Sequence, residues 1–443
     1  MIKIKRFYKK VTAIALATAM MLTLCACGKD AGDDVDSGKH NATKGNYTAN
    51  VLTDDVGEVS VEERKPEDEF VAVTADFAIN VFKTSVAQDI AEGKNVLISP
   101  ESISCALTMT ANGAKDETLL EMEQVLTGGM DINQYNEYLY TYNNKLTSSE
   151  DVEFHMANSI WVMDDEERIK MKEEFLSTCG NYYNADVFMA PFDETTVVDI
   201  NNWVSDNTND MIQKLLDEIP YEAVIYLINA IAFEGTWEDE YEDNQVQEDG
   251  KFTNYAGVKQ NVTMLNSTES LYICDENATG FVKYYEGRDY AFMAILPNDE
   301  DGLADYIDNM TGDDYVDMYN NREYCDVIVK MPEFTYEYDT ELSEYLKEMG
   351  MKLPFAPEAN FENMADTETG LLYINRVIHK TFIQVDRKGT KAAAVTSVEM
   401  KDACASVDME MPKEVILDRP FVYAIIDVET GLPVFMGAVN TIE

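Results

Sequence analysis

Hydrophobic positions in the first half of the folded region recur at helical spacing. Phe70 opens a series of apolar residues three or four positions apart, which predicts a helix. Ser99 and Pro100 then precede a second apolar run. Ser is a favoured N-cap and Pro is favoured at the first helical position, so a second helix is expected from there. The residues of the first series are Phe70, Val73, Phe77, Val81 and Phe82.

Strand patterns enter later in the chain. The expected strands are 224–233, 290–296, 326–331, 421–427 and 433–439. Glu429-Thr430-Gly431 separates the last two and indicates a hairpin. Helices first and strands later, without a regular βαβ rhythm, predict an α+β fold.

The first 27 residues have the form of an export signal. A basic start is followed by an apolar run, 11–24, that is too short to span a bilayer. The run ends in Leu24-Cys25-Ala26-Cys27, which resembles a bacterial lipobox with the small Ala26 before a lipidated Cys27. An ordinary secretory signal with two incidental cysteines is the alternative. We predict a lipoprotein signal peptide over 1–27 and a lipid-anchored, extracellular protein on the bacterial surface.

Residues 28–68 are rich in Asp, Gly, Asn, Thr and Lys, which predicts a flexible acidic stalk. No later stretch has linker composition, so residues 69–443 are expected to form one large domain, and we expect a monomer. Acidic residues outnumber basic ones by 83 to 34, a formal charge of −49. Such a field repels nucleic acid, so no nucleic-acid partner is expected, and it attracts cationic proteins. Solubility or a salty habitat explains the same charge.

Catalytic motifs are missing from the sequence. The chain has three histidines, and it has no G-x-S-x-G, HExxH, P-loop or dinucleotide fingerprint. The exported cysteines are scattered, without a CxxC pair, so neither a disulfide framework nor a zinc site is indicated. We therefore predict no enzyme activity, no metal and no cofactor. Most of the cysteines are expected to be buried and Cys404 to be exposed; they are Cys105, Cys179, Cys274, Cys325 and Cys404.

The most informative stretch follows residue 381. Residues 381–386 alternate as a strand does, and Gly389 offers the backbone freedom of a hinge. The next ten residues, 390–399, are small and contain no Gly or Pro, and both of their charges fall on one face of an extended strand. Residues 400–412 are irregular and should be exposed. The residues alone leave two interpretations open: a loop able to insert into a sheet, or an edge strand followed by a long loop.

Several spaced motifs resemble those of the serpins, in the family's order, over about residues 70–443. The matching segments are Asn95-Val-Leu-Ile-Ser-Pro-Glu-Ser-Ile-Ser104, Asn112-Gly-Ala114, Asn229-Ala-Ile-Ala-Phe-Glu-Gly-Thr-Trp237, Val377-Ile-His-Lys-Thr-Phe382, Arg419-Pro-Phe421 and Phe435-Met-Gly437. The resemblance implies helices packed around three β-sheets, with a five-stranded central sheet and an exposed reactive loop over about 388–412. It also implies suicide inhibition. A target serine protease cuts the loop, and the cleaved loop inserts into the central sheet and traps the covalent acyl-enzyme. A non-inhibitory serpin acting as a carrier or surface binding protein is the alternative.

The resemblance also assigns residues to roles. The hinge is Gly389, Thr390, Ala392, Ala393, Ala394 and Val395; the shutter, a polar cluster under the sheet, is Ser99, Ser102, Asn158, Asn229 and His379; the breach, where insertion starts, is Trp237. Two positions depart from the family pattern. Arg387 stands where Glu is usual and Glu234 where Lys is usual, and we hypothesise that these opposite changes compensate each other.

The cleavage point depends on how the loop is counted. Counting from the hinge places the bond at Ala403-Cys404, whereas counting back from Arg419 places it at Met409-Glu410. We prefer the hinge-side count, because the inserted length sets how far the protease is carried. Ala403 before the bond predicts an elastase- or subtilisin-like target, and Met400 and Met409 are alternatives for such enzymes.

Overall fold

A computed structural model of the chain describes residues 47–442 apart from a few short gaps. The residues outside the description are 1–46, 55, 58, 150, 166, 220–224, 369–371, 391–410 and 443. The export signal, Cys27, most of the predicted stalk and most of the reactive loop therefore lie outside the described residues.

Helices gather in the first half of the folded region, as the apolar spacing predicts. Helix α1 carries Phe70, Phe77 and Phe82 on buried positions, and Ser99 caps α2 by accepting a hydrogen bond from the Ser102 backbone N–H at 3.2 Å. α1 is long and apolar enough to cross a membrane, but 56% of its apolar 18-residue stretch is buried inside the body, as in a core helix. The helices are α1 Asp68–Ala91, α2 Pro100–Ala111, α3 Asp116–Leu126, α4 Ile132–Leu146, α5 Glu173–Tyr183, α6 Glu194–Asn207, α7 Leu303–Asn309, α8 Gly312–Asn320 and α9 Ser343–Met349, with short 3₁₀ turns at Asp243–Gln245, Glu286–Arg288 and Leu353–Phe355.

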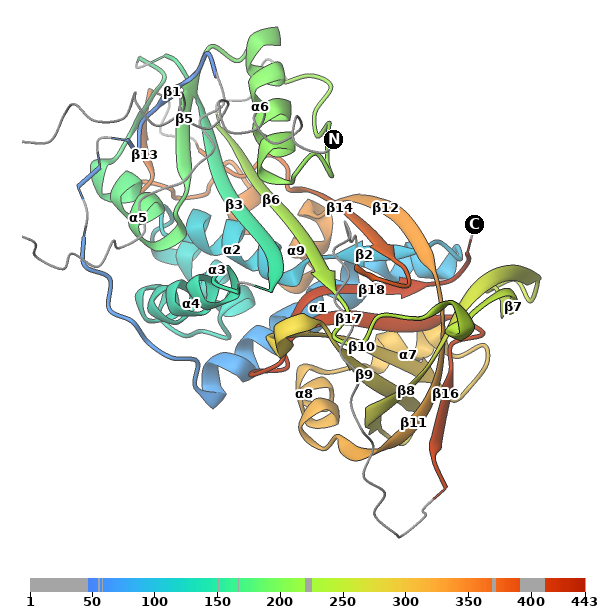
Figure 1. Cartoon of the computed structure of the whole chain (residues 1–443). Helices are drawn as coiled ribbons and strands as arrows, with labels where there is room; N and C mark the ends of the chain where they lie inside the picture. Colours follow the sequence, from blue (N-terminus) through green and yellow to red (C-terminus); the bar gives the residue numbers. More distant parts are fainter. Residues whose placement is uncertain are drawn as a thin grey trace, which may run out of the picture. The chain divides into compact units, whose positions relative to one another are not determined.

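The central sheet contains five longer strands and two strands of two residues each. Its order is β1-β5-β3-β6-β15-β14-β12, and β1 and β15 are the short ones. Figure 1 labels the strands of this sheet apart from β15. β15 stands between β6 and β14 at one rung, and the described sheet has no ladder that joins β6 directly to β14. The bounds are β1 Asn50–Val51, β5 Asp186–Ala190, β3 Val152–Met163, β6 Ile225–Thr236, β15 Gly389–Thr390, β14 Ile378–Val385 and β12 Phe334–Glu341.

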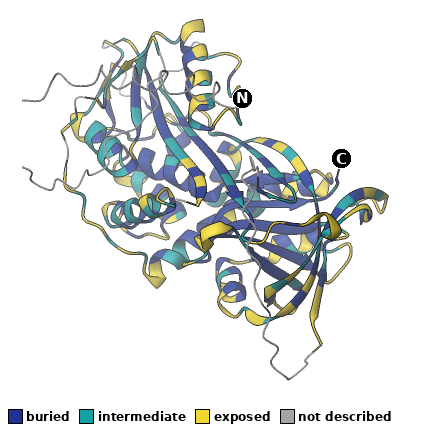
Figure 2. Ribbon diagram, viewed as in Figure 1, coloured by how far each residue is buried: buried dark blue, intermediate teal, exposed yellow. Residues whose placement is uncertain are grey.

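A second sheet of nine strands carries much of the hydrophobic core. Strands β10, β17 and β18 are buried along their whole length (Figure 2). Gly431 turns the β17–β18 hairpin with φ of 75°, as the turn signal predicts. The bounds are β16 Lys413–Ile416, β11 Glu323–Pro332, β8 Lys259–Cys274, β9 Ala278–Tyr284, β10 Tyr290–Pro297, β17 Phe421–Asp427, β18 Pro433–Val439, β2 Val96–Ile98 and β7 Val246–Thr253; β4 Ile169–Met171 and β13 Ala365–Thr367 form a small third sheet.

The predicted α+β architecture is confirmed, with strand ends shifted. β17 and β18 have the expected bounds, whereas β6 and β11 extend beyond the apolar runs that predicted them. Local periodicity finds the buried centre of a strand, but pairing continues through residues such as Gly235 and Glu323 that carry no apolar signal. Of the cysteines within the described residues, Cys105 and Cys179 are buried, Cys325 is partly buried and Cys274 is exposed.

The prediction of a flexible stalk up to Asp68 was wrong for its last part. β1 pairs antiparallel with β5, with Asn50 opposite Met189, and so covers the edge of the central sheet. The side chains of Tyr47 and Val51 pack on the apolar cluster between α6 and the sheet. Polar composition suggested a stalk, but a few apolar residues and an open sheet edge suffice to fix this segment.

A single buried carboxylate fastens the segment to α6. One oxygen of Asp199 accepts hydrogen bonds from the Thr48 backbone N–H at 2.8 Å, the Thr48 hydroxyl at 2.6 Å and the Ala49 backbone N–H at 3.2 Å. Asp199 is buried, so these donors replace the water that its charge has lost.

We predict that Asp199→Ala destabilises the protein by about 2 kcal/mol, because it leaves buried donors without an acceptor. Urea unfolding monitored by tryptophan fluorescence measures the change. Asp206→Ala is the matched control, since Asp206 receives only an exposed hydrogen bond from the Tyr47 hydroxyl. Equal stabilities for the two variants would contradict the anchoring role.

Candidate functional site: hinge, breach and shutter

The hinge is a single rung between two long strands. Gly389 lies opposite Thr236 and Thr390 opposite Gly235 on β6, and Thr390 also lies opposite Val385 on β14. A Cβ on Gly389 would come within 2.0 Å of the Gly235 carbonyl oxygen. Gly389 is therefore required by close backbone approach, whereas the sequence suggested conformational freedom.

Thr390 is fixed on the core side of the sheet. Its side chain is buried, and its hydroxyl lies 2.6 Å from the Tyr285 hydroxyl. Tyr285 in turn stacks on Trp237, with ring centroids 4.5 Å apart and an interplanar angle of 14°. The side-chain direction of Thr390 sets which alternate residues of the following segment would face the core.

Trp237, the predicted breach residue, ties β6 to the segment before the hinge. Its indole N–H donates to the Asp386 carbonyl at 2.9 Å, and its backbone N–H donates to the Lys388 carbonyl at 2.8 Å. Because both acceptors belong to the turn between β14 and β15, the buried indole holds that turn in place.

A buried cation under the breach is a feature that the sequence does not reveal. Lys283 pairs with Glu269 at 3.0 Å, and its ammonium lies 4.7 Å from the ring centroid of Tyr241 and 5.5 Å from that of Trp237. It also donates to the Asp239 carbonyl at 3.1 Å. A desolvated ammonium with this many partners keeps the floor of the breach rigid.

Arg387 has acidic partners other than the one that we hypothesised. Its Nε lies 3.8 Å from a carboxylate oxygen of Glu333, and its Nη1 lies 3.4 Å from Asp243. Its backbone N–H also donates to Glu333 at 3.3 Å. Arg387 is therefore accommodated without invoking Glu234, and both ion pairs are too exposed to add more than about 1 kcal/mol of stability.

The five predicted shutter residues form one continuous hydrogen-bonded chain. The Ser99 backbone N–H donates to His379 Nε2 at 2.9 Å, and the Ser99 hydroxyl oxygen accepts from the Ser102 backbone N–H. The Ser102 hydroxyl bonds the side-chain oxygen of Asn229, whose amide donates to Asn158 at 2.6 Å. Three elements, α2, β6 and β3, are thus linked to His379 on β14.

This network continues into residues that the sequence analysis missed. The Asn158 amide donates to the Cys105 sulfur and to the Tyr183 carbonyl, each at 3.3 Å. The Tyr183 hydroxyl donates to Asn136 at 2.5 Å. Cys105, Asn136 and Tyr183 lie on three different helices, so no local spacing in the sequence marks them.

Glu101 is a buried acid in the first turn of the shutter helix α2. One of its carboxyl oxygens has no hydrogen-bond partner, and neither does the side-chain oxygen of nearby Asn143. Burial raises the pKa of the Glu101 carboxyl to about 8, with Asp427 adding to the rise and the hydrogen bond from Asn143 opposing it. The group is therefore mainly protonated at neutral pH, which avoids an uncompensated charge beneath the sheet.

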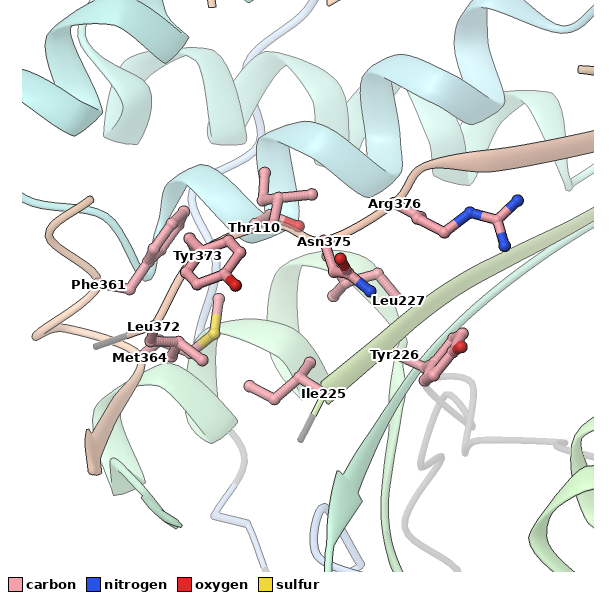
Figure 3. Close-up of a pocket in the computed structure, with 11 residues that line it drawn as sticks. Thr110, Ile225, Tyr226, Leu227, Phe361, Met364, Leu372, Tyr373, Asn375 and Arg376 are labelled. Carbon is pink, nitrogen blue, oxygen red and sulfur yellow. The ribbon is translucent and has the colours of Figure 1, made fainter. Parts of the chain in front are cut away.

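A partly open, mostly apolar cavity lies at the N-terminal end of β6, beside the segment that leads into β14 (Figure 3). Ile225 and Leu227 of β6 form one side of it, and Thr110 of α2 contributes to its lining. Its other lining residues are Tyr226, Phe361, Met364, Leu372, Tyr373, Ile374, Asn375 and Arg376.

The remaining predicted site residues lie outside the described part of the chain. They are Ala392, Ala393, Ala394, Val395, Met400, Ala403, Cys404, Met409 and the lipidation residue Cys27. Within the described residues, no group of three or more His, Cys, Asp or Glu side chains is arranged to hold a metal ion.

His379 should make the stability of the native state depend on pH. Burial lowers its pKa to about 4 from an ordinary 6.5, so the unfolded chain binds the proton more readily. Stability is then lost as the pH falls from 6.5 towards 4, by at most about 3 kcal/mol.

We predict that His379→Gln removes this loss, so that its unfolding midpoint changes less than that of the wild type between pH 7 and pH 4.5. Urea unfolding at several pH values measures the difference. His155→Gln is the control, because His155 is a half-exposed histidine on β3. The same acid sensitivity in His379→Gln and in the wild type would refute the assignment.

Comparison with known proteins agrees with this geometry. The family model described as "Serpin (serine protease inhibitor)" matches residues 72–442. The native form of tengpin, a thermophilic serpin, is 44% identical with a TM-score of 0.82, and the match covers 89% of this chain and 100% of that one. The latent form of tengpin is 42% identical with a TM-score of 0.75, and covers 86% and 100%. An uncharacterized serpin-like protein from Methanosarcina mazei is 30% identical over 374 residues, 82% of this chain and 85% of that protein. The chain belongs to the serpin family.

Proposed function

We propose that the chain is an exported suicide-substrate inhibitor of serine proteases with a small apolar specificity pocket. Membership of a family of serine protease inhibitors supports the general class of function. The observation that carries the specific proposal is the hinge rung. β15 begins a strand between β6 and β14, and no described ladder joins these two strands below it.

Continuing the ladder in the same register assigns a place to every inserted residue. Thr390 lies opposite Gly235 and Val385, so six residues further on Thr396 falls opposite Asn229 and His379. Ten residues beyond Thr390, Met400 falls opposite Ile225, the first described residue of β6. The inserted segment would therefore fill the slot over the length of β6.

The inward face of that segment matches what lies beneath it. Thr390 faces the core, so the inward residues after it are Ala392, Ala394, Thr396, Val398 and Met400. In this register the polar Thr396 would lie over the polar shutter, where its hydroxyl can bond, and the apolar Met400 would lie over the mostly apolar cavity.

The outward face accounts for the second departure from the family pattern. In the same register Lys391 falls opposite Glu234, and directly opposed charges of opposite sign stabilise a sheet pair. Glu234 is thus suited to the inserted state through Lys391, whereas Arg387 is held by Glu333 and Asp243.

The chemistry is supplied by the protease. Its serine oxygen adds to the carbonyl carbon of Ala403 and the peptide bond breaks. The proton lost by the serine passes to the nitrogen of Cys404, which leaves as a free amine. Ala403 remains as an ester on the protease. Insertion of the segment after Thr390 would then carry the ester about 40 Å from the hinge, at 3.3 Å per residue, and distort the protease before water attacks.

Export and anchoring are part of the proposal. A signal over 1–27 with a lipidated Cys27 would tether the inhibitor to the cell surface. The segment between Cys27 and Tyr47 would span at most about 65 Å, because an extended chain covers about 3.4 Å per residue. The inhibitor would therefore meet proteases close to the membrane.

We predict a covalent, SDS-resistant complex when the full chain is incubated with pancreatic elastase. Denaturing gels detect the complex, and mass spectrometry identifies the released C-terminal peptide, which should begin at Cys404. A peptide that begins one residue after Met400 or Met409 would move the cleavage point but not the mechanism. Clean cleavage without complex would contradict inhibition and favour a carrier.

The register supplies a matched pair of substitutions for the insertion step. Ala394→Arg places a charge on the inward face over the core, whereas Ala393→Arg places it on the outward face. We predict that Ala394→Arg, like Thr390→Arg, is cleaved as a substrate with little complex, and that Ala393→Arg still forms complex. Equal yields of complex from Ala393→Arg and Ala394→Arg would rule out this register.

A further inference from the structure

The side chains of two tyrosines, two arginines and one methionine lie near the two points where the reactive loop leaves and rejoins the body. We call this group the loop-base patch. It consists of Tyr284, Arg288, Arg322, Tyr324 and Met411.

One side of the patch adjoins the start of the loop. Thr390 is the last described residue before the loop. Its hydroxyl lies 2.6 Å from the hydroxyl of Tyr285. Tyr284 precedes Tyr285 in the chain, and Arg288 lies in the short turn that follows. Tyr285 is also bridged to Trp237 at the breach. This half of the patch is therefore fixed beside the point where the loop departs.

The other side adjoins the end of the loop. The chain resumes at Met411, and β16 runs parallel to β11 with Lys413 opposite Val327. Met411 stands two residues before Lys413, the first residue of β16. The Lys413 ammonium also lies 3.6 Å from the carboxylate of Glu323.

The two sides belong to one sheet and are held in place by the fold. Tyr324 on β11 lies opposite Leu271 on β8, and Leu271 lies opposite Val282 on β9, two residues before Tyr284. The Arg288 guanidinium lies 4.9 Å from the ring centroid of Tyr284 and pairs with Glu238 at 2.8 Å. The Arg322 guanidinium lies over Tyr319 and donates to its carbonyl. These side chains have already lost much of the freedom that binding would otherwise cost.

The packing of the fold does not account for the exposure of the patch. Tyr324 is 77% exposed and Met411 is 89% exposed. In the described part of the chain, the Tyr324 side chain has no hydrogen bond and no ring contact. A register shift after Tyr324 marks a bulge in the β8–β11 pair, and bulges commonly redirect side chains.

We propose that the loop-base patch is a second contact surface for the target protease, engaged while the protease sits on the reactive loop. This inference rests on the proposed function. Tyr, Arg and Met are enriched in the centres of protein interfaces, and Tyr and Arg dominate binding hot spots. A protease bound on the reactive loop would face the body between the two ends of the loop, where this patch lies. Because Arg288 is already paired with Glu238, its remaining N–H groups would be met by carbonyl oxygens of the protease.

The test compares second-order rate constants for reaction with pancreatic elastase. We expect Tyr324→Ala to lower the rate constant at least about tenfold, the scale of a hot-spot truncation, while the number of inhibitor molecules consumed per protease stays unchanged. Arg288→Ala should act in the same direction. Tyr255→Ala is the control, because Tyr255 is 53% exposed and packs near Gly93, away from the loop.

The experiment distinguishes failure of the patch proposal from failure of the proposed inhibitory function. If the wild type is merely cleaved, kcat/KM for cleavage replaces the inhibition rate, and the same tenfold loss in Tyr324→Ala would support the patch without inhibition. Rates within twofold of the wild type in both patch variants would overturn the inference. So would a wild-type dimer in size-exclusion chromatography that Tyr324→Ala converts to a monomer, because the patch would then serve self-association.

Discussion

The central sheet depends on a single rung, the two residues of β15 between β6 and β14. The rung is held through its side chain as much as its backbone, because Thr390 bonds Tyr285 and Tyr285 stacks on Trp237. Trp237 in turn donates two hydrogen bonds to carbonyls of the turn that precedes the hinge. A new strand therefore begins, and is stabilised, at one end of the slot between β6 and β14. Insertion of the cleaved loop requires this arrangement.

The shutter residues are polar, and their polarity bears on how the sheet can receive an inserted strand. Each described shutter side chain has a hydrogen-bond partner from another element, so the polar groups of the network are satisfied beneath the sheet. His379 accepts from a backbone N–H and is therefore neutral, and Glu101 keeps its proton at neutral pH. A neutral network can meet the hydroxyl of an incoming residue without the cost of moving a buried charge.

Caps, apolar spacing and turn residues predicted the helices and the hairpin that such short stretches of sequence determine. Ser99 and Pro100 fix the start of α2, the spacing from Phe70 fixes α1, and the turn at Gly431 fixes the last hairpin. The family motifs supplied the five shutter residues, and the structure brings all five together.

The rest depends on contacts between residues far apart in the chain. Tyr285 meets Thr390 across 105 positions, and Asp199 meets Thr48 across 151. No periodicity encodes such pairs. The stalk was misjudged for this reason, since the edge of β5 that receives β1 cannot be recognised from the composition of residues 47–54. Gly389 was recognised as necessary, but the cause, a carbonyl 2.0 Å from where a Cβ would stand, is a tertiary contact.

The register of the hinge rung determines where each inserted residue would lie in the slot between β6 and β14. A strand that continues from Thr390 must alternate its side chains, so its inward residues are fixed once Thr390 is known to face the core. The only hydroxyl on that inward face beyond the hinge then falls at the polar cluster, and the largest apolar side chain falls at the cavity beside Ile225. A shift of one residue would turn Lys391 inward over Gly235, beside the buried Tyr285 hydroxyl, where its charge would be desolvated. The sheet thus accepts this segment in one register, and the hinge rung already sets it.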